Sequence, residues 1–180
     1  MKTYRHAIAL FGIFAVSLLG LWAQQQSKLP PPPEEKLGPP GPEQPIPFSH
    51  KVHVGLGIKC TDCHTLKDEE GFAAGFPRES TCMGCHASVK KDSPAIQKLA
   101  EYAKARKPVP WVRVYKVPEY VWFSHESHHK EAGIACETCH GKVGERDVLF
   151  REVSIRMDAC MACHARNDAS NDCGFCHNPN

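Results

Sequence analysis

Ten cysteines occur in the chain of 180 residues, and all of them fall into five short motifs of one kind. Each motif has the form Cys-x-x-Cys-His. The five are Cys60-Cys63-His64, Cys82-Cys85-His86, Cys136-Cys139-His140, Cys160-Cys163-His164 and Cys173-Cys176-His177. This pattern is typical of covalent haem c attachment, in which the two thiols form thioethers and the histidine ligates the iron.

Two other uses of paired cysteines explain the pattern less well. Zinc ribbons also pair Cys-x-x-Cys motifs, but they do not need a histidine after every pair, and five pairs leave one without a partner. A disulfide scaffold would spread its cysteines to close longer loops, and it would give no reason for the five histidines. The sequence therefore predicts five haems c.

The remaining histidines indicate how the irons are ligated. Of eleven histidines, five belong to the motifs and His6 lies near the N-terminus, which leaves His50, His53, His125, His128 and His129. Five further imidazoles match five open axial positions, so we expect bis-histidine ligation for most or all haems. His129 is the weakest candidate because it adjoins His128. Met157 is the competing sixth ligand, and it would raise the potential of its haem.

An internal repeat divides the chain into modules. Residues 47–64 and 122–140 both contain Phe-Ser-His, a second histidine three residues on, and then Gly-Ile-x-Cys-x-x-Cys-His. The second copy has one extra residue between the histidines and the cysteines. We predict a two-haem module at 48–93 and a three-haem module at 122–180. Residues 94–121 connect them by a helix from Pro94 to about Lys107 and an extended segment.

The N-terminal region predicts export from the cytoplasm. Lys2 and Arg5 precede an uncharged apolar run at residues 7–23. Residues 1–23 are therefore read as a signal peptide or an N-terminal membrane anchor, which would give contact with the membrane through 7–23. Residues 24–47 form a proline-rich linker. The expected location is periplasmic or otherwise extracytoplasmic, with anchoring in the inner membrane as the alternative to cleavage.

Few other segments show regular periodicity. With aromatic residues at only 8% of the chain, side chains alone would make a thin core. The expected fold is irregular, with loops and short helices packed around five haems c and an N-terminal apolar helix.

The FSHKVH and FSHESHH elements, with the CTDCH and CETCHG motifs that follow them, resemble the class III multihaem cytochromes c, which are small bis-histidine proteins. The resemblance covers about residues 45–180 and implies that His50 and His125 ligate the haems that follow them directly. It also implies that His53 and His128 serve haems elsewhere in their modules, and that Phe48 and Phe123 lie against haem faces. The segment VPWVRVYKVPEYVWFSH is similar, more weakly, to the pentahaem subunit of alternative complex III, a membrane quinol-oxidising assembly.

These features favour an electron carrier over an enzyme. Bis-histidine iron has no open position for a substrate, so we expect electron transfer between a membrane quinol-oxidising system and a downstream acceptor. The alternatives are a catalytic reductase of a small oxyanion and a structural haem subunit of a respiratory complex or filament.

Charge indicates the kind of partner. Without Lys2 and Arg5 the chain has 20 basic and 20 acidic residues, so nucleic-acid binding is not indicated. Ionised haem propionates would make the loaded protein negative by roughly 5 to 10 charges. We expect redox partner proteins that carry basic patches.

Overall fold

The structure is a computed structural model, and it describes residues 34–66 and 74–177. Contacts divide the chain into two units, Met1–Glu35 and Lys36–Asn180, and the fold given below is that of the second unit. The predicted apolar helix within 1–23 lies outside the described residues, as do the first part of the proline-rich linker and residues 67–73.

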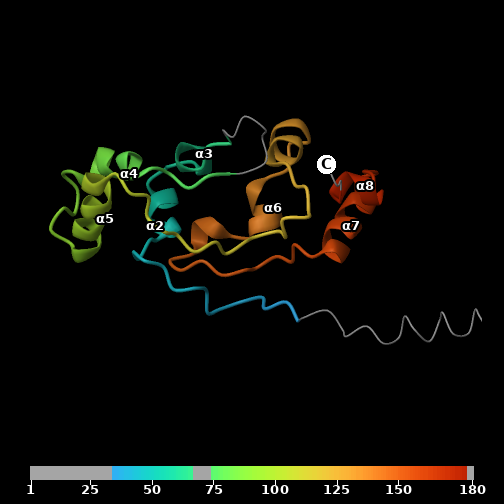
Figure 1. Cartoon of the computed structure of the whole chain (residues 1–180), viewed down its shortest axis with the longest axis horizontal. Helices are drawn as coiled ribbons and strands as arrows, with labels where there is room; N and C mark the ends of the chain where they lie inside the picture. The colour runs from blue at the N-terminus through green and yellow to red at the C-terminus, as the bar shows by residue number, and fades with distance from the viewer. Residues whose placement is uncertain (1–33, 67–73, 178–180) are drawn as a thin grey trace, which may run out of the picture. The chain divides into compact units, whose positions relative to one another are not determined.

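The described part consists of short helices joined by loops, and no strand occurs in it (Figure 1). The elements in chain order are α2 (His50–Gly55), α3 (Cys60–Cys63), α4 (Glu79–His86), α5 (Pro94–Ala105), the π-helix η1 (Glu126–Glu131), α6 (Cys136–His140), the 3₁₀-helix η2 (Val143–Glu145), α7 (Met157–Arg166) and α8 (Cys173–Cys176). The predicted irregular fold of loops and short helices is confirmed. Within these ranges no helix is both long enough and apolar enough to cross a membrane.

The helix predicted from Pro94 is present as α5. Ser93 caps it by accepting a hydrogen bond from the Ile96 amide at 3.3 Å, and Pro94 occupies its first turn, where a missing N–H costs nothing. The helix ends at Ala105 because Arg106 adopts a left-handed conformation with φ 52°. Its end is therefore two residues before the position expected from the sequence.

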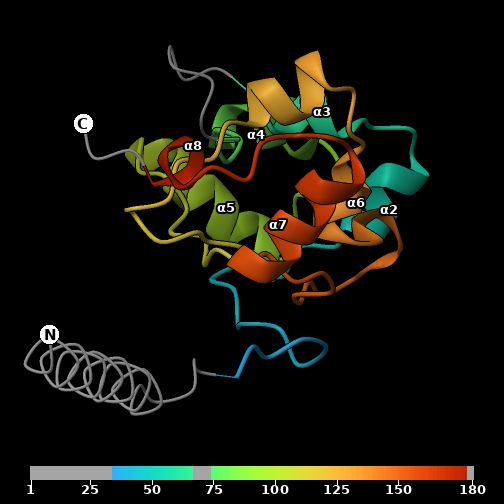
Figure 2. The same cartoon turned by 90° about the vertical axis from the view of Figure 1, so that its right-hand side faces the viewer.

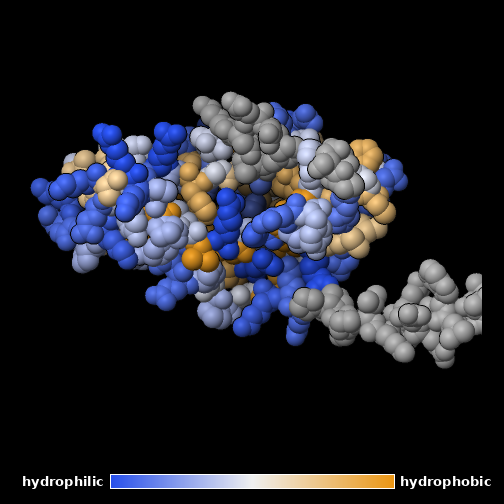
Figure 3. Space-filling model, viewed as in Figure 1, coloured by the Kyte–Doolittle hydropathy of each residue, from blue (hydrophilic) through white to orange (hydrophobic). Residues whose placement is uncertain are grey.

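The apolar core of the described residues is small. Ile46, Leu99 and Val109 are buried, and Tyr102 and Trp111 are among the half-buried residues packed against them. This cluster joins α5 to the chain on either side of it. In Figure 3 the apolar residues appear as separate patches between charged ones. The helices that carry the cysteine motifs contain no buried residue, although Cys82 and Met83 of α4 pack against this cluster.

The proline-rich segment is docked where the structure describes it. The Gly38 amide donates to the Arg151 carbonyl at 2.8 Å, and the side-chain amide of Gln44 exchanges two hydrogen bonds of 2.9 Å with the backbone of Val112. Gly41 lies so close to the Leu149 carbonyl that a Cβ atom would not fit. Residues from Lys36 onward therefore belong to the compact unit, which the proline content of the predicted linker did not indicate.

The helices of the second unit are arranged from one side of it to the other. Figure 1 shows α4 and α5 at the left, α2, α3 and α6 in the middle, and α7 and α8 at the right. Figure 2, turned by 90°, brings α7 and α8 toward the viewer. Because each of the five cysteine motifs lies on its own helix, this arrangement also orders the candidate sites.

Candidate haem-binding sites

Each cysteine motif forms a single helical turn or the end of a short helix. The pairs lie on α3, α4, α6, α7 and α8, so both thiols of a pair project from neighbouring positions of one turn. All ten cysteines are free thiols, either exposed or half-buried. Among the described residues no group of three or more histidine, cysteine or carboxylate side chains is arranged to hold a metal ion, whereas a structural zinc site needs four ligands.

Four of the five motif histidines are oriented by hydrogen bonds from Nδ1 to backbone carbonyls. The acceptors are Gly75 O for His64 at 2.9 Å, Val89 O for His86 at 3.0 Å, Ser170 O for His164 at 2.6 Å and Tyr120 O for His177 at 3.3 Å. A carbonyl can only accept, so each Nδ1 carries the proton and each Nε2 keeps a free lone pair. This is the tautomer that a metal ligand requires.

The structure brings four motif histidines together with four of the other histidines. The ring centroids are 6.3 Å apart for His50 and His64, 6.2 Å for His53 and His86, 6.3 Å for His125 and His140, and 6.0 Å for His128 and His164. A metal–imidazole nitrogen bond is about 2 Å long and the ring centre lies about 1 Å further, so two imidazoles on opposite faces of one metal place their centroids about 6 Å apart. The four pairs have the spacing of axial ligand pairs.

His129 and His177 are not part of such a pair. The ring neighbour of His177 is Tyr120, with centroids 5.9 Å apart. The Nδ1 atom of His129 lies 2.9 Å from the Ile134 carbonyl, so its Nε2 is also free for a ligand. Met157 is 65% exposed at the start of α7. The structure therefore brings together eight of the ten histidines proposed as ligands.

Each Phe-Ser-His element places a phenyl ring between two of these imidazoles. Phe48 is edge-on to His50 at 4.8 Å and stacked on His53 at 4.4 Å. Phe123 is edge-on to His125 at 4.9 Å and stacked on His128 at 4.5 Å. The two copies of the repeat thus build the same local geometry, in which one ring fixes the imidazoles of two neighbouring sites.

The extra residue of the second copy is accommodated as a π-helical turn. In the first copy α2 is an α-helix, whereas η1 in the second copy is a π-helix, which holds one more residue per turn. His53 and His128 keep equivalent positions, since their Nδ1 atoms contact the carbonyls of Ser49 and Ser124 at 2.7 and 2.8 Å. The extra residue therefore lies between His128 and Ile134, the stretch that contains His129.

Burial lowers the pKa of two ligand candidates, His50 and His140. The pKa of His50 is lowered to about 4, by burial first and then by the neighbouring His64 and His53. The Nδ1 atom of His50 is buried, with no hydrogen-bond partner among the described residues. Burial also lowers the pKa of His140, with His125 and His64 as further causes. Neutral imidazole is the form that binds a metal.

Tyr115, which the motifs did not reveal, contacts His140 and is itself held by residues 152 and 153. The Tyr115 hydroxyl donates to the His140 carbonyl at 3.3 Å and accepts from the amides of Glu152 and Val153 at 2.9 and 3.2 Å. Its ring is edge-on to the His140 imidazole at 4.8 Å. Arg146 binds the Glu152 carboxylate with two hydrogen bonds of 2.6 and 3.2 Å. No spacing rule connects these residues, so sequence inspection could not identify them.

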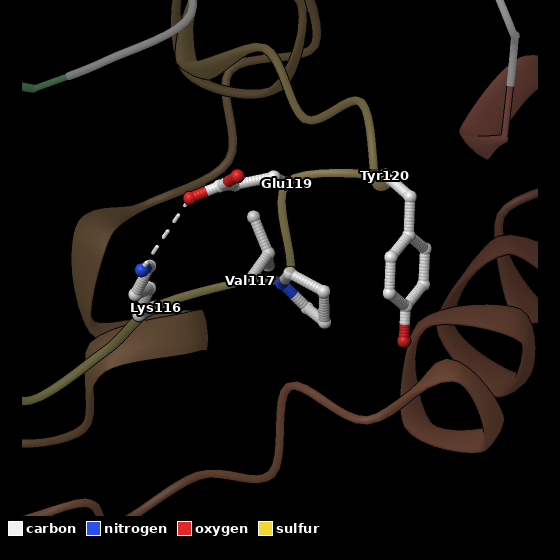
Figure 4. A pocket seen from close by; sticks show the side chains of 5 residues that line it. Lys116, Val117, Glu119 and Tyr120 are labelled. Atoms are coloured by element: carbon white, nitrogen blue, oxygen red, sulfur yellow. Dashed lines mark ion pairs between the residues drawn. The ribbon is translucent and has the colours of Figure 1, made fainter.

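The described surface has one shallow pocket that the histidines do not form. It is lined by residues 116–120, as Figure 4 shows, and the Lys116 ammonium and the Glu119 carboxylate at its rim are 4.0 Å apart. The Tyr120 side chain on its other side is the ring neighbour of His177. Both charges are exposed, and an ion pair between such groups is weak. The pocket has no nucleophile with an adjacent base, and nothing in it suggests a catalytic centre.

Paired thiols on helical turns, oriented imidazoles and four axial-type pairs define a multihaem c-type cytochrome. Comparison with known proteins agrees, because the family model described as cytochrome c7 and related cytochrome c matches residues 46–105 and 121–178. The chain belongs to this family. It is also 33% identical to a protein of Nitratidesulfovibrio vulgaris (strain Hildenborough), named menaquinone reductase, multiheme cytochrome c subunit, over 75% of this chain and 77% of that protein.

Proposed function

We propose that the chain is a pentahaem c-type cytochrome that transfers electrons outside the cytoplasm. Haem c supplies reversible one-electron chemistry when it is bound. The four imidazole pairs, each with one histidine from a Cys-x-x-Cys-His motif, carry the proposal. An iron held by two imidazoles can pass an electron but offers no position for a substrate.

The residues divide into two roles. The ten cysteines would fix the five haems covalently, and the five motif histidines would ligate one face of each iron. His50, His53, His125 and His128 would ligate the opposite face in the four pairs. Carbonyl acceptors and the phenyl rings of Phe48 and Phe123 would hold the imidazoles in position.

The proposed partner is a quinone-linked membrane complex. The similar protein from N. vulgaris is named as a subunit of a menaquinone reductase, which supports a membrane partner of this class. We propose that electrons pass between such a system, acting as a quinol oxidase, and a downstream redox protein. The signal or anchor segment at 7–23 would place the chain at the outer side of the membrane.

Spectroscopy of the ferric holoprotein tests this function. We expect low-spin bis-histidine signals from at least four haems, and reversible reduction and reoxidation with no turnover of nitrite. Purification from membranes should recover the chain together with a quinone-linked complex. A mainly high-spin spectrum, or a preparation that contains zinc and no haem, would contradict the proposal.

A second candidate function rests on the His177 site. Its ring neighbour in the described structure is Tyr120 and not a histidine, which favours a position where a small oxyanion could bind. A catalytic reductase would use this site. Titration of the ferric protein with cyanide and nitrite separates the two functions, because an electron carrier should show no nitrite-dependent turnover even if one haem binds cyanide.

A further inference from the structure

The two Phe-Ser-His elements each connect two neighbouring sites. Phe48 contacts both His50, which pairs with His64, and His53, which pairs with His86. The sites of α3 and α4 are therefore adjacent. Burial raises the pKa of the Cys82 thiol, and the Cys63 thiol of the neighbouring motif raises it further.

The second element makes the same connection in the other module. Phe123 contacts both His125, which pairs with His140, and His128, which pairs with His164. The sites of α6 and α7 are adjacent in the way that those of α3 and α4 are.

A packed junction joins the two modules. Helix α2, which carries His50 and His53, packs on η2, which follows His140 directly. The Lys51 amide donates to the Arg146 carbonyl at 3.0 Å, and the Ser49 hydroxyl donates to the Asp147 carboxylate at 2.6 Å. A Cβ atom on Gly144 would lie 3.1 Å from the Val54 side chain, so the two elements approach closely.

The side chains that meet at this junction belong to the first site of each module. The Cys136 thiol shares a hydrogen bond with the Cys60 thiol. The residues on both sides of His50, the partner of His64, are hydrogen-bonded to residues 146–147, which follow His140 closely in the chain. The sites of α3 and α6 therefore face each other across the junction of α2 and η2.

The last site adjoins the α7 end of this series. The Nδ1 atom of His164 lies 2.6 Å from the Ser170 carbonyl, and the Asn171 side-chain amide donates to the Met161 carbonyl at 3.1 Å, so α7 is tied to the segment that leads into α8. The Trp122 amide donates to the Cys176 carbonyl at 2.8 Å, which ties α8 to the start of the second Phe-Ser-His element. Figure 1 shows the same succession, with α4 at one side and α8 at the other.

From these contacts we propose that the five sites form one unbranched path, in the order α4, α3, α6, α7, α8, which differs from the order of the motifs along the chain. The path crosses between modules once, from the His64 site to the His140 site. This proposal rests on the proposed function, because it requires a haem at every motif.

Each step of this path transfers one electron. One site is oxidised and the next is reduced, and no atom or proton moves. A one-electron reductant supplies the electron at one end, and a one-electron oxidant removes it at the other. The chain order of the motifs would instead make the α4 and α6 sites neighbours.

The test is proton NMR of the fully reduced holoprotein, in which bis-histidine haems are diamagnetic. Each haem is assigned through cross-peaks to the histidine of its own motif, such as His64 for the α3 haem and His140 for the α6 haem. We expect inter-haem cross-peaks between the α3 and α6 haems and between the α7 and α8 haems, with none between the α4 and α6 haems. Cross-peaks from the α4 haem to the α6 haem, without any between the α3 and α6 haems, would overturn the proposed order.

A variant at the junction gives a second readout. Gly144→Val should push α2 away from η2 and weaken the cross-peaks between the α3 and α6 haems, while those within each module persist. Gly55→Val is the matched control, since no atom lies within 4 Å of the added Cβ there. Equal cross-peaks in both variants would contradict the junction. If the unmodified holoprotein showed no low-spin signals, the proposed function itself would be refuted instead.

Discussion

The imidazole planes of His50 and His64 are only 8° from parallel, whereas those of His53 and His86 meet at 62°. The second module repeats the contrast, with 5° for His125 and His140 and 33° for His128 and His164. In each module, the first histidine of the Phe-Ser-His element lies nearly parallel to its partner and the second does not. Hydrogen bonds at Nδ1 fix ring orientation in several of these sites.

This contrast predicts two kinds of low-spin signal. The angle between two axial imidazole planes sets the anisotropy of ferric haem, and nearly parallel planes give the smaller anisotropy. Electron paramagnetic resonance of the oxidised protein should show two haems of the rhombic type and at least one with a much larger highest g-value, from the 62° pair. A spectrum in which all haems are of one type would contradict the geometry.

His128 and His129 should behave differently when they are replaced, although they are neighbours. His128 pairs with His164, so His128→Ala should leave that iron without its second imidazole. We expect about one fifth of the total haem to become high-spin, given five attachment motifs. His129→Ala is the matched control, and its spectrum should equal that of the unmodified protein. A new high-spin fraction in His129→Ala would show that this residue ligates an iron.

Tyr115→Phe should destabilise the region around His140. The hydroxyl accepts hydrogen bonds from the amides of Glu152 and Val153, and its removal leaves two half-buried N–H groups without a partner. We expect a loss of about 1–3 kcal/mol in the free energy of unfolding, measured by denaturant titration of the holoprotein. Tyr120→Phe is the control, because that side chain is 71% exposed. An equal, small effect of both changes would remove the supporting role from Tyr115.

Gly141→Ala should cost more stability than a substitution at another glycine with positive φ. Gly141 has φ 71° and ψ −163°, a region open essentially only to glycine, and an added Cβ would lie 2.6 Å from the Cβ of Glu152. Strain and overlap together should cost about 2 kcal/mol or more. At Gly133 the φ is 66° and nothing lies within 4 Å of the added atom, so Gly133→Ala should cost only about 1 kcal/mol. The same cost at both positions would contradict the close contact with Glu152.

The sequence was sufficient for the class of protein and for part of the fold. The α5 helix from Pro94 could be predicted because a capping serine, a proline and a helical apolar period all coincide there. The irregular fold followed from the lack of such periods elsewhere. Whether residues 48–93 and 122–180 act as separate modules stays a prediction.

Other features depend on contacts between distant residues, which no local pattern encodes. The docking of Gln44 on Val112 and the support of His140 by Tyr115 join residues far apart in the sequence. The π-helical form of η1 could have been suspected from the extra residue in the second repeat. The number of histidines outside the motifs equals the number of motifs, which suggested up to five imidazole pairs. The structure assembles four, because the distance between two imidazoles in the fold, and not their number in the sequence, decides which of them meet.

The central claim is that every Cys-x-x-Cys-His motif carries a covalent haem. Mass spectrometry of the denatured chain, together with a pyridine haemochrome assay, tests it most directly. The account predicts a mass increase equal to five haems and a haemochrome ratio of five haems c per chain. A chain that carries no covalent haem, or that keeps free thiols at any of the five motifs after maturation, would contradict it.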